Sequence, residues 1–213
     1  LISLGIMREF VTKFSPSKIF YLYYDGNDFP SDLSHEKKNK ILISYLDNNF
    51  SQDLFNGVHN SDLFLRKKVS MAHPQNDLDF FQHLKNFFSF KHFLNLSTLR
   101  NSVSATNQYP NVDYTLLSKT FRSMREVAKN IESEIIFIYL PSWKTLNGLN
   151  QRTFKKVREK VIEIAQENFQ VLDMTKSMGS EQNFNKFFYY PESHYNEKGY
   201  FFVANQLAKF LKN

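Results

Sequence analysis

The pattern of apolar residues along the chain predicts three buried strands. Each is a short run of aliphatic and aromatic residues that ends at a turn signal, which is typical of strands inside a sheet. The runs are KIFYLYY at 18–24, EIIFIYL at 134–140 and QVLDMT at 170–175. These three segments are the expected core of the fold.

One amphipathic helix is predicted before the second strand in the sequence, at 114–131, and another after it, at 152–168. Apolar side chains recur in both at helical spacing. They are Leu117, Phe121, Met124, Ala128 and Ile131 in the first helix, and Phe154, Val157, Val161, Ile164 and Ala165 in the second. Strands that alternate with helices indicate parallel βαβ units with right-handed crossovers. We therefore expect an α/β fold in which a parallel sheet lies between two layers of helices.

Both ends of the chain also carry helical patterns. The segment LGIMREFVTKF at 4–14 places Leu4, Met7, Val11 and Phe14 on one side of a helix. A last helix is expected after Asn196, because asparagine is a favourable N-cap and the glutamate that follows it suits the helix dipole.

The stretch from 32 to 111 interrupts the alternation of strands and helices. It contains a predicted helix at 35–48 and a phenylalanine-rich helical segment, DLDFFQHLKNFFSFKHFLNL, at 77–96. The stretch is too long for a simple connection. We expect a helical insertion that covers one rim of the sheet, within a single domain spanning 1–213.

Composition narrows the class of protein. The 213 residues, 42% of them hydrophobic, suffice for one well-packed domain. The net charge is +6, but the basic residues are scattered, so a solvated surface is favoured over a nucleic-acid interface. Without cysteine there is no disulfide, which leaves both a cytoplasmic and a periplasmic location open. No apolar run approaches the roughly 20 residues of a membrane-spanning helix, so no span is expected.

Polar residues that could support chemistry follow each predicted strand. Ligands of such sheets bind outside the carboxyl ends of the strands, so these residues can converge: Asn27, Ser142, Trp143, Glu192 and His194. A histidine base, a carboxylate that orients it and a neutral hydrogen-bond donor are the parts of an acyl-transfer site. No nucleophile is evident. The other histidines lack metal-ligand spacing, and neither a metal nor a cofactor is expected.

Two of these segments resemble sequence blocks of the SGNH (GDSL-like) hydrolases. KIFYLYYDGNDFPSDL is similar to the block in which a strand ends in Gly-x-Asn-Asp, and PESHYNEKGYFFVANQLAKFL to the block with the catalytic histidine and the last helix. The resemblance implies that Asn27 donates to the oxyanion, that Asp28 lines the substrate site and that His194 is the base. It also implies a three-layer, flavodoxin-like fold and an ester-linked acyl group, on a carbohydrate or a lipid, as substrate.

The chain departs from the family pattern at several positions. Asp25 stands where the family has glycine, and Pro191 replaces the usual acid, so Glu192 would orient His194. The Gly-Asp-Ser turn is absent. The family's strand order of 2-1-3-4-5 then implies that strands one and two are missing, and that the chain, which begins at Leu1 inside a helical pattern, is inactive without an upstream serine.

Other interpretations of the same residues stay open. His194 could be an ordinary loop residue before a helix, and DGND an ordinary turn after a strand. The chain would then be a non-catalytic flavodoxin-like binding module, in which Ser142 and Trp143 line a loop. If strands one and two are absent, the strand at 18–24 becomes a bare sheet edge, which predicts a homodimer paired through it or a cover by the amino-terminal helix.

Overall fold

The computed structural model describes residues 1–26, 28, 32–57, 62–63, 113–148 and 151–212, with the side chains of 151–154 left out. The chain divides into two compact units, one made of Leu1–Gln52 and Val112–Asn213 and the other of Asp53–Asn111. The phenylalanine-rich segment at 77–96 lies outside the described residues.

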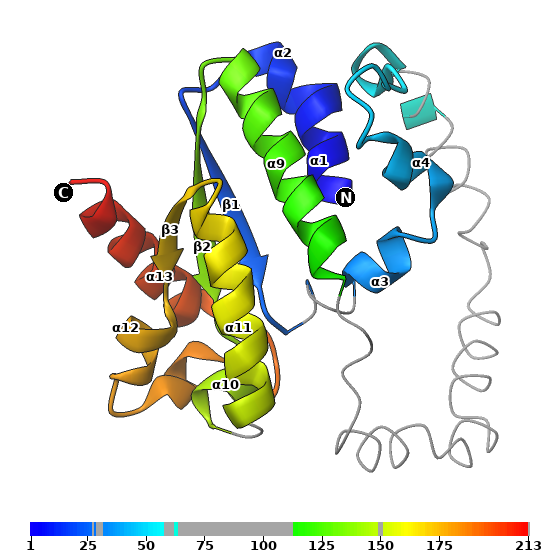
Figure 1. Ribbon diagram of the computed structural model, residues 1–213. Helices are drawn as coiled ribbons and strands as arrows, with labels where there is room; N and C mark the ends of the chain where they lie inside the picture. Colours follow the sequence, from blue (N-terminus) through cyan, green and yellow to red (C-terminus); the bar gives the residue numbers. More distant parts are fainter. Residues whose placement is uncertain (27, 29–31, 58–61, 64–112, 149–150, 213) are drawn as a thin grey trace, which may run out of the picture. The chain divides into compact units, whose positions relative to one another are not determined.

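The sheet of the first unit has three parallel strands in the order β1-β2-β3 (Figure 1). They are β1 (Lys18–Tyr24), β2 (Glu134–Leu140) and β3 (Gln170–Asp173). The three predicted strands are confirmed, although β3 ends at Asp173 because Met174 already has helical backbone angles and begins the next helix. The parallel pairing confirms the predicted βαβ units.

One face of the sheet packs against the long helices α9 (Tyr114–Asn130) and α11 (Gln151–Gln166). Both match the predicted helices, and α9 begins where the Asp113 carboxylate accepts a hydrogen bond from the backbone N–H of Leu116 at 3.0 Å. The rings of Phe121 and Phe137 meet at the centre of this layer, with centroids 5.5 Å apart. Apolar burial of this kind is the main stabilising contribution in such a core.

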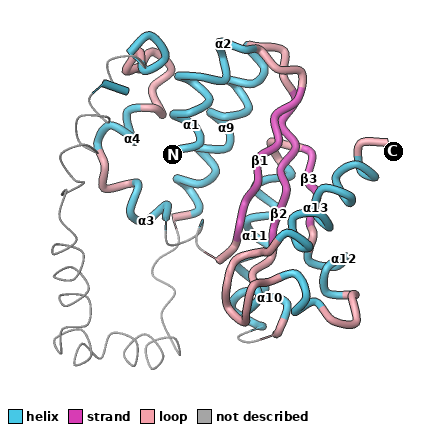
Figure 2. Tube along the Cα trace, turned by 180° about the vertical axis from the view of Figure 1, so that it is seen from behind, coloured by secondary structure: helices cyan, strands magenta, loops and turns pink. Residues whose placement is uncertain are grey.

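The opposite face of the sheet packs against a second layer, which Figure 2 shows from behind. Its elements are α10 (Trp143–Leu146), α12 (Thr175–Gly179), the 3₁₀ helix η3 (Phe184–Phe187) and α13 (Glu197–Phe210). Alternate residues of β2 serve the two layers, since Phe137 faces the first and Ile136 and Ile138 face the second. The unit is therefore a mixed α/β fold with both faces of its sheet covered. The continuous apolar run of β2 after Glu134 fits a strand that is buried on both faces.

The strand β1 forms one edge of this sheet. No other strand in the described part of the chain pairs with its outer side. The helices of the second layer leave Phe20 and Leu22 partly uncovered, with 40% and 48% of their surface exposed. An aromatic and aliphatic strand with an open edge is a ready site for further pairing.

The amino-terminal helix forms, but its predicted apolar face is partly wrong. It runs as α1 (Ile2–Ile6), a π-helical turn η1 (Met7–Val11) and α2 (Thr12–Phe14). Leu4 and Met7 are buried as predicted, whereas Phe14 is 72% exposed. A π turn holds more residues than an α turn, so it rotates the following side chains away from the core.

The same turn buries a glutamate that the apolar pattern does not predict. The Glu9 carboxylate accepts hydrogen bonds from the Tyr45 hydroxyl at 2.9 Å and the Gln52 backbone N–H at 2.6 Å. These contacts tie the segment after α4 (Lys40–Ser44) to the amino-terminal helix.

The predicted helix at 35–48 forms as two short helices, α3 (Leu33–Glu36) and α4. The break lies at Asn39, whose extended backbone and side-chain oxygen cap α4 through Ile41 N–H. Both helices belong to the first unit, so only the part of the expected insertion from Asp53 onward forms the second one. Within the described residues, no helix combines the length and the apolar character needed to cross a membrane.

Candidate functional site

The segment that carries His194 is a tightly bonded turn between η3 and α13. The Ser193 hydroxyl donates to the Tyr190 carbonyl at 2.6 Å and accepts from the Tyr190 N–H at 2.9 Å. The buried Tyr195 donates its hydroxyl to the carbonyl of Pro141, which follows β2. The Asn196 side chain accepts from the Gly199 N–H at 3.1 Å, so the predicted helix cap is confirmed. These bonds fix the backbone on both sides of His194 while its side chain stays at the surface.

The turn places His194 at the carboxyl end of β1. Its imidazole lies against Tyr24, the last residue of the strand, with ring centroids 5.2 Å apart. The Tyr24 hydroxyl also donates to the Ser193 carbonyl at 3.4 Å. Asn27 follows Tyr24 by three positions in the sequence but lies outside the described residues. Residues 24 and 194, far apart in sequence, thus meet at the edge of the sheet where ligands of such folds bind.

No hydrogen bond or ion pair joins Glu192 to His194 among the described residues. The Glu192 backbone has a positive φ of 64°, and its carboxylate forms an ion pair with Lys144 at 2.9 Å. Both side chains of this pair are about half exposed, so it contributes little to stability. In the described residues the His194 ring has no hydrogen bond to a carboxylate. The predicted orienting role of Glu192 therefore requires its side chain to turn toward His194.

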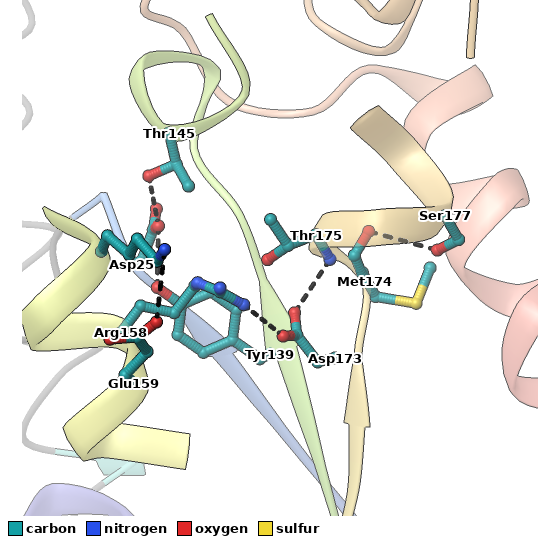
Figure 3. Close-up of polar contacts among 10 residues, drawn as sticks. Asp25, Tyr139, Thr145, Arg158, Glu159, Asp173, Met174, Thr175 and Ser177 are labelled. Carbon is teal, nitrogen blue, oxygen red and sulfur yellow. Dashed lines mark hydrogen bonds and ion pairs between the residues drawn. The ribbon is translucent and has the colours of Figure 1, made fainter. Parts of the chain in front are cut away.

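Asp25 connects the ends of β1 and β2, which the sequence did not predict. Its carboxylate accepts hydrogen bonds from the Tyr139 hydroxyl at 2.9 Å, the Thr145 hydroxyl at 2.6 Å and the Ser142 backbone N–H at 2.5 Å. Figure 3 shows it between Tyr139 and Thr145. The sequence did contain a signal for this contact. An acid directly follows one strand, and residues with hydroxyl groups lie at the end of the next strand and just after it.

Ser142 and Trp143 have structural partners of their own. Ser142 is buried and caps α10 by accepting from the Thr145 N–H at 3.4 Å. The Trp143 indole donates to the Asn185 side chain at 2.7 Å and packs beside Phe184. Both follow β2 as predicted, but they start the helix α10 instead of lining a loop, with Ser142 as its N-cap and Trp143 as its first residue.

Asp173 has a structural role at the end of β3. It pairs with Arg158 of α11 at 2.5 Å and accepts from the Thr175 N–H at 2.9 Å (Figure 3). The ion pair joins β3 to α11, and the hydrogen bond from Thr175 lies at the start of α12. In the part of the chain that is described, no group of acidic and histidine side chains could hold a metal ion.

A hollow of about 370 Å³ lies at the other end of the sheet. It is lined by Arg125, by Glu134 at the start of β2 and by Gln170 at the start of β3, among others. His194 lies beyond the carboxyl end of β1, so this hollow is separate from the site around it.

Asp28 is the last residue of the DGND segment, of which Asp25, Gly26 and Asp28 are described. It accepts a hydrogen bond from the Tyr24 N–H at 2.7 Å, which connects the turn back to β1. Burial raises the pKa of the Asp28 carboxyl to about 6, against the opposing effect of that hydrogen bond, and the nearby acids Asp32, Glu36 and Asp25 raise it further.

Replacing Asp28 with asparagine is expected to remove a pH dependence of stability. Because folding raises the pKa of Asp28, the unfolded chain loses this proton at lower pH than the folded chain. The contribution to the free energy of unfolding is thus full below about pH 4 and is lost as the pH rises to about 6. Urea unfolding of the unaltered protein and of Asp28→Asn between pH 4 and pH 7 measures this pH-dependent contribution. A constant difference between the two proteins at every pH would show that folding leaves the pKa of Asp28 unchanged.

Comparisons with models of protein families, with curated proteins and with solved structures found no match to this chain. Any assignment of function therefore depends on the residues and geometry described above.

Proposed function

We propose that this chain belongs to an SGNH-like esterase or O-acyltransferase, with His194 as its general base. The observation that carries the proposal is the packing of His194 against Tyr24, at the end of the strand that leads into DGND. A histidine beside that strand end is where an acyl-transfer base would serve an oxyanion donor at Asn27. The parallel α/β sheet and the capped helix after His194 are consistent with this fold type.

The proposed reaction uses a serine that is not identified among these 213 residues. The His194 imidazole removes the proton of the serine hydroxyl while the serine oxygen bonds to the carbonyl carbon of the ester. Asn27 donates a hydrogen bond to the resulting oxyanion, and Glu192 holds the imidazole. The imidazolium returns the proton to the leaving alcohol as the ester bond breaks. Water, or an acceptor alcohol in a transferase, then releases the acyl group by the same steps.

The test compares two proteins, the 213-residue chain and the longest natural polypeptide that contains it. Only the longer one should hydrolyse short-chain nitrophenyl esters and react covalently with a fluorophosphonate probe. A peptide map should place the probe on a serine outside this sequence. Absence of both activities from the longer protein would contradict the proposal.

A non-catalytic binding module is the second candidate. The ion pair between Lys144 and Glu192 favours it, because that pair takes the carboxylate that His194 would need. The two candidates differ in the result with the fluorophosphonate probe, which a binding module does not consume.

We also propose that a second copy of the 213-residue chain covers the outer edge of β1. Antiparallel pairing of two such edges about a twofold axis would satisfy their backbone groups and cover Phe20 and Leu22. Light scattering should then give about twice the chain mass of 25.3 kDa. Leu22→Lys, which adds a charge to this edge, should restore the monomer, whereas Lys212→Leu at the far end of the chain should not. A monomeric unaltered chain would contradict the pairing.

A further inference from the structure

We infer that a row of aromatic side chains leading away from His194 binds a neutral oligosaccharide. The inference names the substrate class of the proposed active site and depends on the proposed function for its catalytic meaning. The binding itself requires no serine nucleophile, so it can be measured with the 213-residue chain.

The row is a connected series of rings on the surface near the carboxyl end of β1. It passes from His194 to Tyr24, with centroids 5.2 Å apart, then to Tyr195 at 5.9 Å and to Tyr200 at a further 5.9 Å. Tyr195 is buried and supports the others from below. We call His194, Tyr24, Tyr200 and Tyr189 the aromatic row.

Tyr189 extends the row past the first turn of α13. Its hydroxyl donates to the Glu197 carboxylate at 3.3 Å, and Glu197 stands one helical turn before Tyr200. The Glu197 carboxylate raises the pKa of Tyr189, and the Tyr200 phenol adds to the effect.

The outer rings of the row are exposed far beyond the usual degree for aromatic residues. Tyr189 is 63% exposed and Tyr200 is 54% exposed, although burial of an aromatic ring is strongly favourable. The rigid turn at 190–193 and the start of α13 hold their backbones, so little conformational freedom remains to be lost on binding.

The chemistry of the row favours a sugar over a lipid. The faces of pyranose rings carry C–H groups that stack on aromatic rings, while their hydroxyl groups need hydrogen-bond partners at the rim. Tyrosine offers both an apolar face and a polar hydroxyl. A surface for acyl chains would instead present mainly aliphatic side chains, whereas the exposed apolar neighbours here are the aromatic residues Phe201 and Phe20 and the aliphatic residue Leu22.

The charges around the row favour a neutral ligand. Lys144 is paired with Glu192 at 2.9 Å, and Lys186 with Glu181 at 2.7 Å. A binding surface for nucleic acid would require unpaired basic groups along the rings. Two of the neighbouring lysines are thus offset by acids, whereas Lys198, two residues before Tyr200, is exposed and forms no ion pair within the described residues, so single-stranded DNA is tested as the competing ligand.

The binding experiment uses the 213-residue chain and three neutral hexasaccharides, namely those of β-1,4-linked N-acetylglucosamine, glucose and xylose. Calorimetric titration should give a dissociation constant on the order of 0.1–1 mM for at least one of them. Tyr200→Ala and Tyr189→Ala should each weaken binding by about fivefold or more. Tyr200→Phe, which keeps the ring, should weaken it less than Tyr200→Ala.

Phe14→Ala is the matched control, because Phe14 is also an exposed aromatic residue but lies on α2, in the helical layer on the opposite face of the sheet. It should leave affinity unchanged. Thermal unfolding of each variant separates loss of binding from loss of fold. Failure to bind all three sugars, equal weakening by Phe14→Ala, or binding of neutral lipid vesicles or single-stranded DNA in their place would overturn the inference. Binding without any ester hydrolysis by the longer polypeptide would sustain the inference and reject the proposed reaction.

Discussion

Replacing His194 with alanine in the longest natural polypeptide that contains this sequence is expected to lower its rate of ester hydrolysis by about four powers of ten. Without the imidazole no group takes the proton of the serine, so the hydroxyl attacks the ester in its weakly nucleophilic form. Because the His194 side chain is exposed and the Ser193 and Asn196 bonds fix the turn, the substitution should leave the fold intact. Initial rates with nitrophenyl acetate, together with thermal unfolding, measure both effects.

His35→Ala is the control for this experiment, since it removes a histidine from α3, an element that carries no predicted site residue. It should retain the full rate. Lys144→Ala tests the state of Glu192: if Glu192 orients His194, breaking its ion pair should leave the rate unchanged or raise it. An unchanged rate in His194→Ala would remove His194 from the mechanism and leave the binding module as the better explanation.

The strands and long helices could be predicted from sequence because local pattern and burial agree there. In β2 every residue after Glu134 is buried, and the sequence shows a continuous apolar run. In α9 the buried residues recur at helical spacing, among them Leu117, Phe121 and Met124. The prediction of buried residues failed where the apolar pattern of the sequence and the tertiary contacts favour different arrangements. The π turn at Met7–Val11 buries Glu9 and turns Phe14 outward, because contacts from the segment after α4 stabilise the carboxylate.

The site was predictable only in part for a similar reason. His194 and the Asn196 cap belong to one short segment, so the sequence motif contains both. Asp25 instead acquires its role from Tyr139 and Thr145, which lie 114 and 120 positions later in the chain. No local pattern records such a meeting. The Lys144 partner of Glu192 also comes from a different element, the helix α10, and the motif around His194 does not contain it.

Asp25→Ala is expected to lower the free energy of unfolding by about 3 kcal/mol, because it leaves several donors without an acceptor. The Tyr139 hydroxyl belongs to a residue that is almost fully buried, and the Ser142 N–H begins α10. Neither group can readily exchange its lost bond for one to water. Urea unfolding at neutral pH measures the loss of stability.

Asp25→Asn is the matched variant and should lose clearly less stability than Asp25→Ala. Its amide oxygen can still accept from the Ser142 N–H, and its NH₂ group can donate to the hydroxyl oxygens of Tyr139 and Thr145 once these rotate. Equal losses in the two variants would mean that the negative charge matters more than the connections. Since the Asp25 bonds hold the loops after β1 and β2 together, Asp25→Ala should also weaken oligosaccharide binding more than Asp25→Asn does. Stability and binding would then fall in the same order because both depend on one carboxylate that joins the two strand ends.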